Sequence, residues 1–396
     1  MLSLDKVFDA QRVLKHILRE TNVVKSYGIA PDCELYLKPE NLQITGSFKV
    51  RGSAYKIAML SESEKAKGVI ASSAGNHAQG VALAAAKNGI KSLICLPDSA
   101  PISKIEATKG FGAEVCLVEG CYDDAYQKAL ALKDQEGYTF VHPFDDENVI
   151  AGQGTIALEI LNDLDNIDAI VVPVGGGGLI SGIAYTVKQI RPNIKIYGVQ
   201  VAGAPSMYNS IKNGRIETLD SVQTIADGIA VRQPGENTYN LVSEYVDEIA
   251  LVSDDEVASA ILALIEKQKM IAEGAGATAI AAVMFHKFPL SGKRVVAVVS
   301  GGNIDVTSLS RVIHRGFLNS GRSSSLLIEL IDKPGQLKEI SRIIADCGGN
   351  VTEVHYEKGN TESVNGCFLR IEMETRDYDH VKQITQSLQK EGFKII

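Results

Sequence analysis

One lysine of the chain has the surroundings that covalent amine chemistry requires. Lys49 lies in the stretch 45–52 (TGSFKVRG), and the apolar residues that follow recur at helical spacing, so a helix is predicted to begin near it. The positive end of a helix dipole disfavours protonation of a nearby amine. A solvated position on a helix face is the usual place for a lysine. The neighbouring Gly46, Ser47 and Gly52 favour the other interpretation, in which an unprotonated amine forms a Schiff base.

Four consecutive glycines, 175–178, lie between the apolar strand pattern 169–174 and the helix pattern 179–190. Successive backbone N–H groups of such a loop, at a helix N-terminus, form an anion site. The loop is not G-x-G-x-x-G and no lysine follows it as in a P-loop, so we expect a monophosphate rather than a dinucleotide or nucleoside triphosphate. A flexible turn is the alternative, but four glycines in a row are unfavourable unless the backbone must approach something closely.

Two further loops carry hydroxyl and amide groups after apolar strand patterns: 72–77 (SSAGNH) and 300–303 (SGGN). Ligands of open α/β sheets lie at the carboxyl ends of strands, so both loops and the glycine loop are predicted to meet at one ligand. Ser73, Asn76 and His77 together form a donor set suited to a carboxylate. Each alone is more often a helix cap or a buried polar residue.

Composition excludes several functional classes. The 396 residues include 36 glycines and no tryptophan, and the formal charge of -8 argues against nucleic acid or an anionic membrane as the main partner. The six cysteines form no C-x-x-C pair and the seven histidines give no zinc spacing, so we expect no metal site and reduced thiols. No run reaches the roughly 20 apolar residues of a membrane span, and no signal peptide is recognised. We expect a soluble cytoplasmic protein.

The elements that position these loops alternate between strand and helix, which is typical of an α/β protein with open parallel sheets. Two alternating series predict two lobes in one catalytic domain, 1–315, with a small lobe at roughly 45–150. Helices are predicted at 4–19, 78–87, 103–111, 122–136, 154–164, 179–190 and 254–271. Strands are predicted at 34–37, 69–71, 92–96, 114–118, 169–174, 194–200 and 295–300.

The composition changes at residues 316–325 (GFLNSGRSSS), which we interpret as a linker. The remaining residues, 326–396, predict a βαββαβ order, which is typical of a small α+β ferredoxin-like domain. Its predicted strands are 326–331, 351–357, 367–374 and 393–396, with helices at 335–347 and 378–391.

Four motifs resemble, in the same order, those of the pyridoxal-phosphate serine/threonine dehydratases of the tryptophan-synthase-β fold type (fold type II). They are GSFK at 46–49, SAGNH at 73–77, GGGGL at 175–179 and SGGN at 300–303. The resemblance covers about 20–315. The tail, with DKPGQL at 332–337, is similar to an ACT regulatory domain. Within the family, the chain is most similar to the threonine ammonia-lyases, in a short form with one ACT domain.

The resemblance implies pyridoxal 5'-phosphate as the cofactor and assigns a role to each motif. Lys49 would hold the cofactor as a Schiff base and act as the base at Cα. The implied cofactor-binding residues are Lys49, Phe48 beside the ring, Asn76 at the ring hydroxyl, Gly175, Gly176, Gly177, Gly178 and Leu179 at the phosphate, and Ser300 at the ring nitrogen. The implied substrate-carboxylate residues are Ser73, Asn76 and His77.

The implied reaction is the dehydration and deamination of L-threonine to 2-oxobutanoate and ammonia, with L-serine giving pyruvate as a side activity. A serine hydroxyl such as that of Ser300 cannot keep a proton on the ring nitrogen as a carboxylate would, so loss of the Cα proton should be coupled to departure of the β-hydroxyl. A serine dehydratase, a hydroxyaspartate ammonia-lyase and a non-catalytic amino-acid sensor remain alternatives. A Rossmann dehydrogenase is a weaker one, because the G-x-G-x-x-G fingerprint is missing.

At two sites this chain differs from related racemases, and the differences narrow the activities and metal sites that we expect. Those enzymes carry a serine where this chain has Ala74, so efficient racemisation is not expected. They also bind a divalent cation through acids at positions that correspond to Gln200 and Ser206, so no divalent metal is expected there, while a monovalent ion stays open. For Asp227 and Glu273, acids close to the motifs, a structural salt bridge is the favoured interpretation.

The resemblance of the tail implies an effector site at a subunit interface. Asp332, Gly335 and Leu337 lie in the turn between the first strand and first helix, and Asn350 follows that helix. A branched-chain amino acid bound there would shift the population of quaternary states. A domain that only dimerises is the alternative, and a homodimer or homotetramer is expected.

Overall fold

The computed structural model describes residues 2–358 and 366–396 and divides into two compact units, Met1–Leu309 and Ser310–Ile396. The larger sheet of the first unit has six strands in the order β1-β2-β10-β7-β8-β9. Its neighbours are parallel, apart from the antiparallel pair β1 and β2. The strands are β1 (Val24–Lys25), β2 (Glu34–Pro39), β7 (Ala169–Pro173), β8 (Lys195–Val201), β9 (Glu248–Val252) and β10 (Arg294–Val299).

The central strands of this sheet are continuous apolar runs because helices cover both of their faces. All five residues of β7 (AIVVP) are buried, and α12 packs against β7, β8, β9 and β10. The helices of this lobe are α1 (Leu4–Leu14), α7 (Glu147–Asp163), α8 (Gly178–Ile190), α9 (Ser206–Asn213), α10 (Glu236–Tyr245), α11 (Asp254–Ala263) and α12 (Gly274–Met284). Short helical segments are η1 (Glu40–Leu42), η2 (Asp227–Ile229) and η3 (Leu264–Gln268). The first helix ends at Leu14, earlier than the predicted 19.

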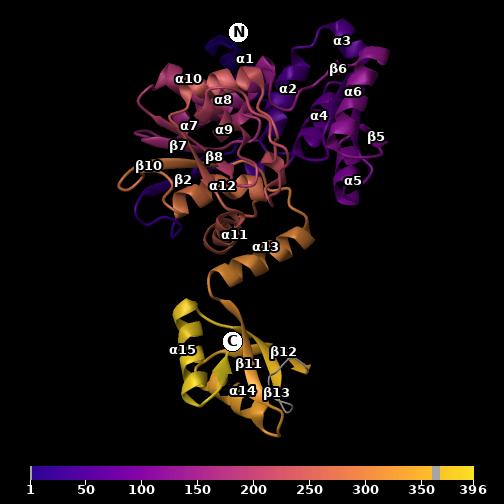
Figure 1. The fold of residues 1–396 in the computed structure, drawn as a ribbon. Coiled ribbons are helices and arrows are strands. Elements are labelled where there is room, and N and C mark those ends of the chain that lie inside the picture. Colours follow the sequence, from indigo (N-terminus) through magenta and orange to yellow (C-terminus); the bar gives the residue numbers. More distant parts are fainter. Residues whose placement is uncertain (1, 359–365) are drawn as a thin grey trace. The chain divides into compact units, whose positions relative to one another are not determined.

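The small lobe contains a parallel sheet in the order β5-β4-β3-β6, and Figure 1 shows it with its helices beside the larger sheet. Alternate residues of β3 face opposite layers: Val69 and Ala71 pack with α4, whereas Ile70 packs under α6. The strands are β3 (Val69–Ser72), β4 (Ser92–Pro97), β5 (Glu114–Val118) and β6 (Thr139–Phe140). The helices are α2 (Lys49–Ala58), α3 (Glu62–Lys67), α4 (Asn76–Lys87), α5 (Ile102–Gly110) and α6 (Tyr122–Glu136).

Main-chain hydrogen bonds join the segment before α2 to the loop that follows β10. The N–H of Phe48 donates to the carbonyl of Ser300 over 3.1 Å, and the N–H of Gly302 donates to the carbonyl of Gly46 over 2.9 Å. Helix α2 therefore begins, at Lys49, beside the carboxyl end of a central strand. These bonds bring together two segments that are about 250 residues apart in the sequence.

A buried ion network fixes α2 against the larger lobe. Arg51 contacts Glu40 through its Nε (2.7 Å) and Glu159 through its Nη1 (2.6 Å), and Lys38 contacts Glu159 over 2.5 Å. Burial opposes ionisation of Glu159, but the charges of Arg51 and Lys38 hold its pKa below the ordinary value. Both Arg51 and Glu40 are fully buried, so each charge depends on its partner.

The second unit has a four-stranded antiparallel sheet in the order β12-β13-β11-β14. With two helices in βαββαβ sequence order, it has the predicted ferredoxin-like arrangement. The elements are β11 (Ser323–Ile331), α14 (Gln336–Asp346), β12 (Asn350–Lys358), β13 (Gly366–Glu374), α15 (Tyr378–Lys390) and β14 (Lys394–Ile395).

The stretch 316–325, interpreted above as a linker, is mostly regular structure. Helix α13 (Val306–Asn319) continues into it and β11 begins at Ser323, which leaves three residues between them. Of the glycines and serines that suggested a linker, Gly316 lies in the helix, Ser320 and Gly321 lie in the short connection, and the last three serines lie in β11. None of the helices described in 2–358 and 366–396 is long and apolar enough to cross a membrane.

Candidate active site

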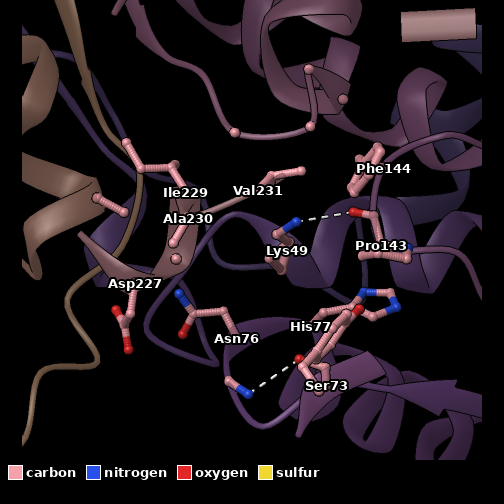
Figure 2. Close-up of a pocket in the computed structure, with 18 of the residues that line it drawn as sticks. Lys49, Ser73, Asn76, His77, Pro143, Phe144, Asp227, Ile229, Ala230 and Val231 are labelled. Carbon is pink, nitrogen blue, oxygen red and sulfur yellow. Dashed lines mark hydrogen bonds between the residues drawn. The ribbon is translucent and has the colours of Figure 1, made fainter. Parts of the chain in front are cut away.

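A cavity of about 1090 Å³ lies in the first unit where both lobes and the four motif loops meet (Figure 2). Its walls include the start of α2, the loop before α4, the loop before α8 and the loop after β10, as the sequence predicted. Several segments that were not predicted also line it. The wall includes 48–49, 72–77, 121–123, 142–145, 175–179 and 227–236, with Glu273, Ser300 and Asn303.

The Lys49 side chain lies in this cavity with its amine on a neutral acceptor. Its Nζ donates to the carbonyl oxygen of Pro143 over 2.9 Å (Figure 2) and lies 5.3 Å from the centre of the Phe48 ring. Burial lowers the pKa of Lys49 to about 8, although the carboxyl of Glu273 acts in the opposite direction. A substantial fraction of this amine is therefore unprotonated near pH 8, as nucleophilic attack requires.

The glycine loop presents backbone N–H groups at the start of α8. Gly177 has φ +98° and precedes the first helical residue, Gly178. The hydroxyl of Thr238 donates to the carbonyl of Gly176 over 2.6 Å, which fixes the orientation of that peptide. A Cβ at Gly176 would lie 2.5 Å from ring atoms of Phe144. The close approach that requires glycine here is thus to an aromatic ring of the cavity wall.

The loop before α4 directs polar groups at the cavity. The hydroxyl of Ser73 accepts from the N–H of Gly75 over 3.1 Å (Figure 2), which leaves its own hydrogen for another acceptor. Helix α4 begins at Asn76, so the N–H groups of its first turn have no partner within the helix. These donors and the helix dipole together favour an anionic group at this place.

The imidazole of His77 is directed into the protein and not toward a ligand. Its Nε2 lies 2.8 Å from the carbonyl oxygen of Val141 and its Nδ1 lies 3.5 Å from the hydroxyl of Ser53. Burial, reinforced by the charge of Lys49, lowers the pKa of His77 to about 3, so the ring is neutral. What His77 can offer a ligand is its main-chain N–H, because the ring nitrogens already have partners.

Asn76 belongs to a chain of side-chain hydrogen bonds across the cavity floor. Asn303 donates from Nδ2 to Asn76 Oδ1 over 2.7 Å, and Asn76 donates from Nδ2 to Glu273 Oε1 over 2.7 Å. Ser300, only 3% exposed, lines the same floor at the carboxyl end of β10. The structure therefore brings Asn76 and Ser300, predicted from separate motifs, into one wall.

Asp227 and Glu273 were both expected to form salt bridges. Asp227 forms one, whereas Glu273 has a different environment. Asp227 pairs with Lys104 over 2.7 Å. Glu273 instead accepts the hydrogen bond from Asn76, and burial, followed by the charge of Asp227, raises its pKa to about 7. An acid directly before the small-residue helix 274–284 (GAGATAIAAVM) is the signal that could have identified it.

The segment after β6 is another part of the wall that the motifs did not indicate. His142 accepts at Nδ1 from the N–H of Asp145 over 2.8 Å, and its ring packs edge-on against Phe144. Burial lowers the pKa of His142 to about 4, despite the opposing charge of Asp145. The position after a strand of the parallel sheet is the available signal, since β6 has only two residues and no clear apolar pattern.

Gln200 and Ser206, the positions that the resemblance to racemases singled out, carry an amide and a hydroxyl. Gln200 accepts at Oε1 from the N–H of Tyr208 over 2.8 Å, and its Nε2 lies 3.5 Å from the carbonyl of Gly175. Ser206 is the first residue of α9. The Gln200 amide thus connects the glycine loop to α9.

The residues implied for an effector site do not come together within one chain. Gly335 (φ +96°), Leu337 and Asp332 lie at the turn between β11 and α14. Asn350 begins β12, next to the end of β13 that pairs with the start of β11, and it donates to Glu374 over 2.9 Å. Because β11 and β12 both run antiparallel to β13, Asn350 lies at the opposite end of the sheet from that turn. The sequence did not indicate this separation.

Comparisons with known proteins agree on the first unit. A family model of pyridoxal-phosphate dependent enzymes matches residues 14–301. An L-threonine ammonia-lyase of Thermotoga maritima is 47% identical over 398 residues, covering 100% of this chain and 99% of that protein. A processed threonine deaminase isoform of Solanum lycopersicum is 38% identical with a TM-score of 0.76, covering 80% of this chain and 90% of the solved one. A maize serine racemase is 34% identical with a TM-score of 0.75, covering 80% and 98%.

Proposed function

Because this chain belongs to the pyridoxal-phosphate-dependent enzymes, we propose that it is a lyase that dehydrates and deaminates L-threonine to 2-oxobutanoate and ammonia, with L-serine as a slower substrate. The observation that carries the proposal is the Lys49 amine, whose pKa is lowered to about 8, in one cavity with the glycine loop. The Thermotoga relative, named for this activity, supports the choice of L-threonine.

The residues of the cavity fit the cofactor. The N–H groups at the start of α8 suit its phosphate, and Lys49 suits its aldehyde. We assign Phe48 to the ring face, Asn76 to the ring hydroxyl and Ser300 to the ring nitrogen. Pyridoxal phosphate, when bound, supplies an aldehyde for amines and a ring that withdraws electrons from the substrate Cα.

In the proposed reaction Lys49 removes the Cα proton, because it is the amine of the cavity that is partly unprotonated near neutral pH. The hydroxyl of Ser73 and the N–H groups at the start of α4 hold the substrate carboxylate. His77 contributes through its main chain, since its ring is engaged elsewhere. The β-hydroxyl takes up a proton and departs as water, and water then hydrolyses the remaining enamine to the 2-oxo acid and ammonia.

The test is the initial rate of 2-oxo acid formation from L-threonine and from L-serine, on full-length protein reconstituted with pyridoxal phosphate. We expect a higher kcat/KM for L-threonine and loss of turnover by at least about 100-fold in Lys49→Ala. A clear preference for L-serine or hydroxyaspartate would replace the substrate assignment. Cofactor binding without turnover of any of these would favour an amino-acid sensor.

Racemisation is a second activity that the fold neighbours raise and that Ala74 opposes. Ala74 lines the cavity between Ser73 and Asn76, and its methyl group cannot carry a proton to Cα. We therefore propose that D-serine forms much more slowly than pyruvate from L-serine. Chiral chromatography of the reaction mixture measures both products, and comparable rates would contradict the assignment.

We also propose that residues 326–396 act as an ACT-type regulatory domain that takes a branched-chain amino acid at the turn 332–337, and that the enzyme is a cytoplasmic homodimer or homotetramer. The βαββαβ order of the second unit supports the domain type. The Thermotoga relative aligns over this part as well. Light scattering of the purified protein measures the oligomeric state, and a monomer would reject that part of the proposal.

A further inference from the structure

Glu273 occupies a position in the cavity wall that the reaction described above does not use. It is 6% exposed and directly precedes α12, and its main-chain N–H donates to the carbonyl of Gly301 over 3.1 Å. A Cβ built on Gly301 would lie 2.3 Å from Glu273 Oε1. The carboxyl group therefore lies against the loop that carries Ser300.

The direction of the hydrogen bonds that reach Glu273 is determined by a backbone carbonyl. Asn303 donates from Nδ2 to the carbonyl of Thr45 over 2.7 Å, and a carbonyl can only accept. The second hydrogen of that Nδ2 goes to Asn76, so the facing atom must be the acceptor Oδ1. The Nδ2 of Asn76 then faces Glu273, whose Oε1 must accept.

We propose that Glu273 is a positioning residue that, as a carboxylate, fixes the Asn76 amide so that its remaining N–H is available to an anionic oxygen of the ligand. The role rests on the proposed function, which places the cofactor ring hydroxyl at Asn76. Protonation of Glu273 removes part of its capacity to accept and introduces a competing donor, so the hold on Asn76 weakens.

The charged groups that face Glu273 come from three elements. Asp227 of η2 disfavours the carboxylate, whereas Lys104 of α5 and Lys49 of α2 favour it. Burial makes the largest contribution, and the pKa of Glu273 is raised to about 7. The switch between the two states of this hydrogen-bond chain therefore falls near neutral pH.

The experiment records the visible absorbance of the bound cofactor between pH 5.5 and 9 in the full-length holoenzyme. We expect a spectral transition in the parent chain near the pKa of Glu273 that is missing in Glu273→Gln, because glutamine does not titrate. In Asp227→Asn the midpoint should move to lower pH, since removing a nearby negative charge lowers the pKa of Glu273. An unchanged transition in Glu273→Gln, or a midpoint that does not fall in Asp227→Asn, would overturn the proposal.

A second measurement separates positioning from simple folding. Equilibrium dialysis at pH 8 should give a cofactor Kd weaker than the parent's for Glu273→Gln, which keeps one acceptor but adds a donor, and weaker still, by about 3- to 10-fold relative to the parent, for Glu273→Leu, which has no acceptor. Equal Kd values for both variants would contradict the role. If the leucine variant does not fold, the pH series on Glu273→Gln decides. The proposed function itself would be overturned if the parent chain showed no cofactor absorbance band, or if the band remained in Lys49→Ala. A parent-like transition in Glu273→Gln would overturn only the role of Glu273.

Discussion

At the residue scale, the reactivity of the cavity follows from what each polar atom already contacts. The amine of Lys49 donates to a main-chain carbonyl. A neutral carbonyl stabilises the charged ammonium form less than a negatively charged carboxylate partner would. The imidazoles of His77 and His142 are neutral because they are buried. The Lys49 amine can therefore change its protonation state near pH 8.

The lowered pKa of Lys49 predicts how fast the apoprotein captures its cofactor. Because the free amine attacks, the rate should rise with pH up to about 8 and then level off. Stopped-flow absorbance after mixing the apoprotein with pyridoxal phosphate measures this rate. N-acetyl-lysine, with an amine pKa of about 10.4, is the control and should show a rate that keeps rising. A protein rate that still rises through pH 10 would contradict the assignment.

Glu273 predicts a pH dependence of stability in the apoprotein. Its pKa is raised in the folded chain from 4.5 to about 7, so the native state holds a proton that the unfolded state releases over this range. Stability attributable to this group therefore falls as pH rises from 4.5 to 7, by on the order of 3 kcal/mol. Glu273→Gln removes that penalty, so the free energy of unfolding in urea should increase more at pH 8 than at pH 5 relative to the parent chain. Equal increases at both pH values would contradict the raised pKa of Glu273.

At the element scale, α2 and α8 begin at the cavity and are held there by packing behind it. Arg51, two residues after Lys49, joins α2 to Glu40 and Glu159. The glycine loop packs against Phe144 and Thr238, so α8 begins at a defined distance from the other wall. The positions of Lys49 and of the proposed anion site thus depend on these contacts.

Removing Arg51 should destabilise the first unit strongly. Arg51→Leu leaves Glu40 buried without a counter-charge, which costs about 3–5 kcal/mol. Arg342 is the matched control, because its pairs with Glu339 and Asp346 are exposed and Arg342→Leu should change stability by less than about 1 kcal/mol. Urea unfolding compares the two. If Arg51→Leu does not fold, adding Glu40→Gln should restore folding. A loss of unfolding free energy in Arg51→Leu no larger than that in Arg342→Leu would show that Glu40 does not depend on Arg51.

The glycine loop should not accept even one methyl group at its second position. Gly176→Ala places a Cβ 2.5 Å from the Phe144 ring, so the loop or the ring must move, at about 1–3 kcal/mol. Cofactor affinity should fall by at least about 10-fold. Gly110→Ala is the control, because that glycine lies at the end of α5 with open space around it. Equilibrium dialysis and urea unfolding measure both effects, and unchanged affinity would contradict the close approach.

At the scale of the whole molecule, the strand–helix alternation allowed both lobes and the βαββαβ unit to be predicted. Which strands lie next to each other was less predictable. Strand β2 pairs with β10 across more than 250 residues, and no periodicity of the sequence encodes such a pairing. Three of the motif loops were expected to meet because ligands lie at the carboxyl ends of parallel strands, and the resemblance added the segment of Lys49. Glu273 and the wall 142–145 were missed because each depends on which chain segments pack together, and Asn350 was misplaced for the same reason.

The second unit predicts regulation of the catalytic rate. We expect L-isoleucine or L-valine to change the rate of L-threonine deamination with a coupling of about 1–3 kcal/mol, because an effector shifts the population of states by its differential affinity. Initial rates across an effector titration measure this, with L-alanine as the control that lacks a branched side chain. Rates that do not respond to any branched-chain amino acid would leave the second unit with an assembly role alone.

The hydrogen bonds between residues 46–48 and 300–302 also have a consequence for how the chain acquires its cofactor. Contacts of such long sequence separation form late, since a large loop must close before they stabilise anything. A nascent chain that lacks β10 and the loop after it has Lys49 but no complete cavity. Cofactor capture should therefore follow folding of the first unit, and a ligand that binds only the folded state then stabilises it by mass action. The colour of the bound cofactor would report, in a refolding experiment, the moment when the two ends of this unit have met.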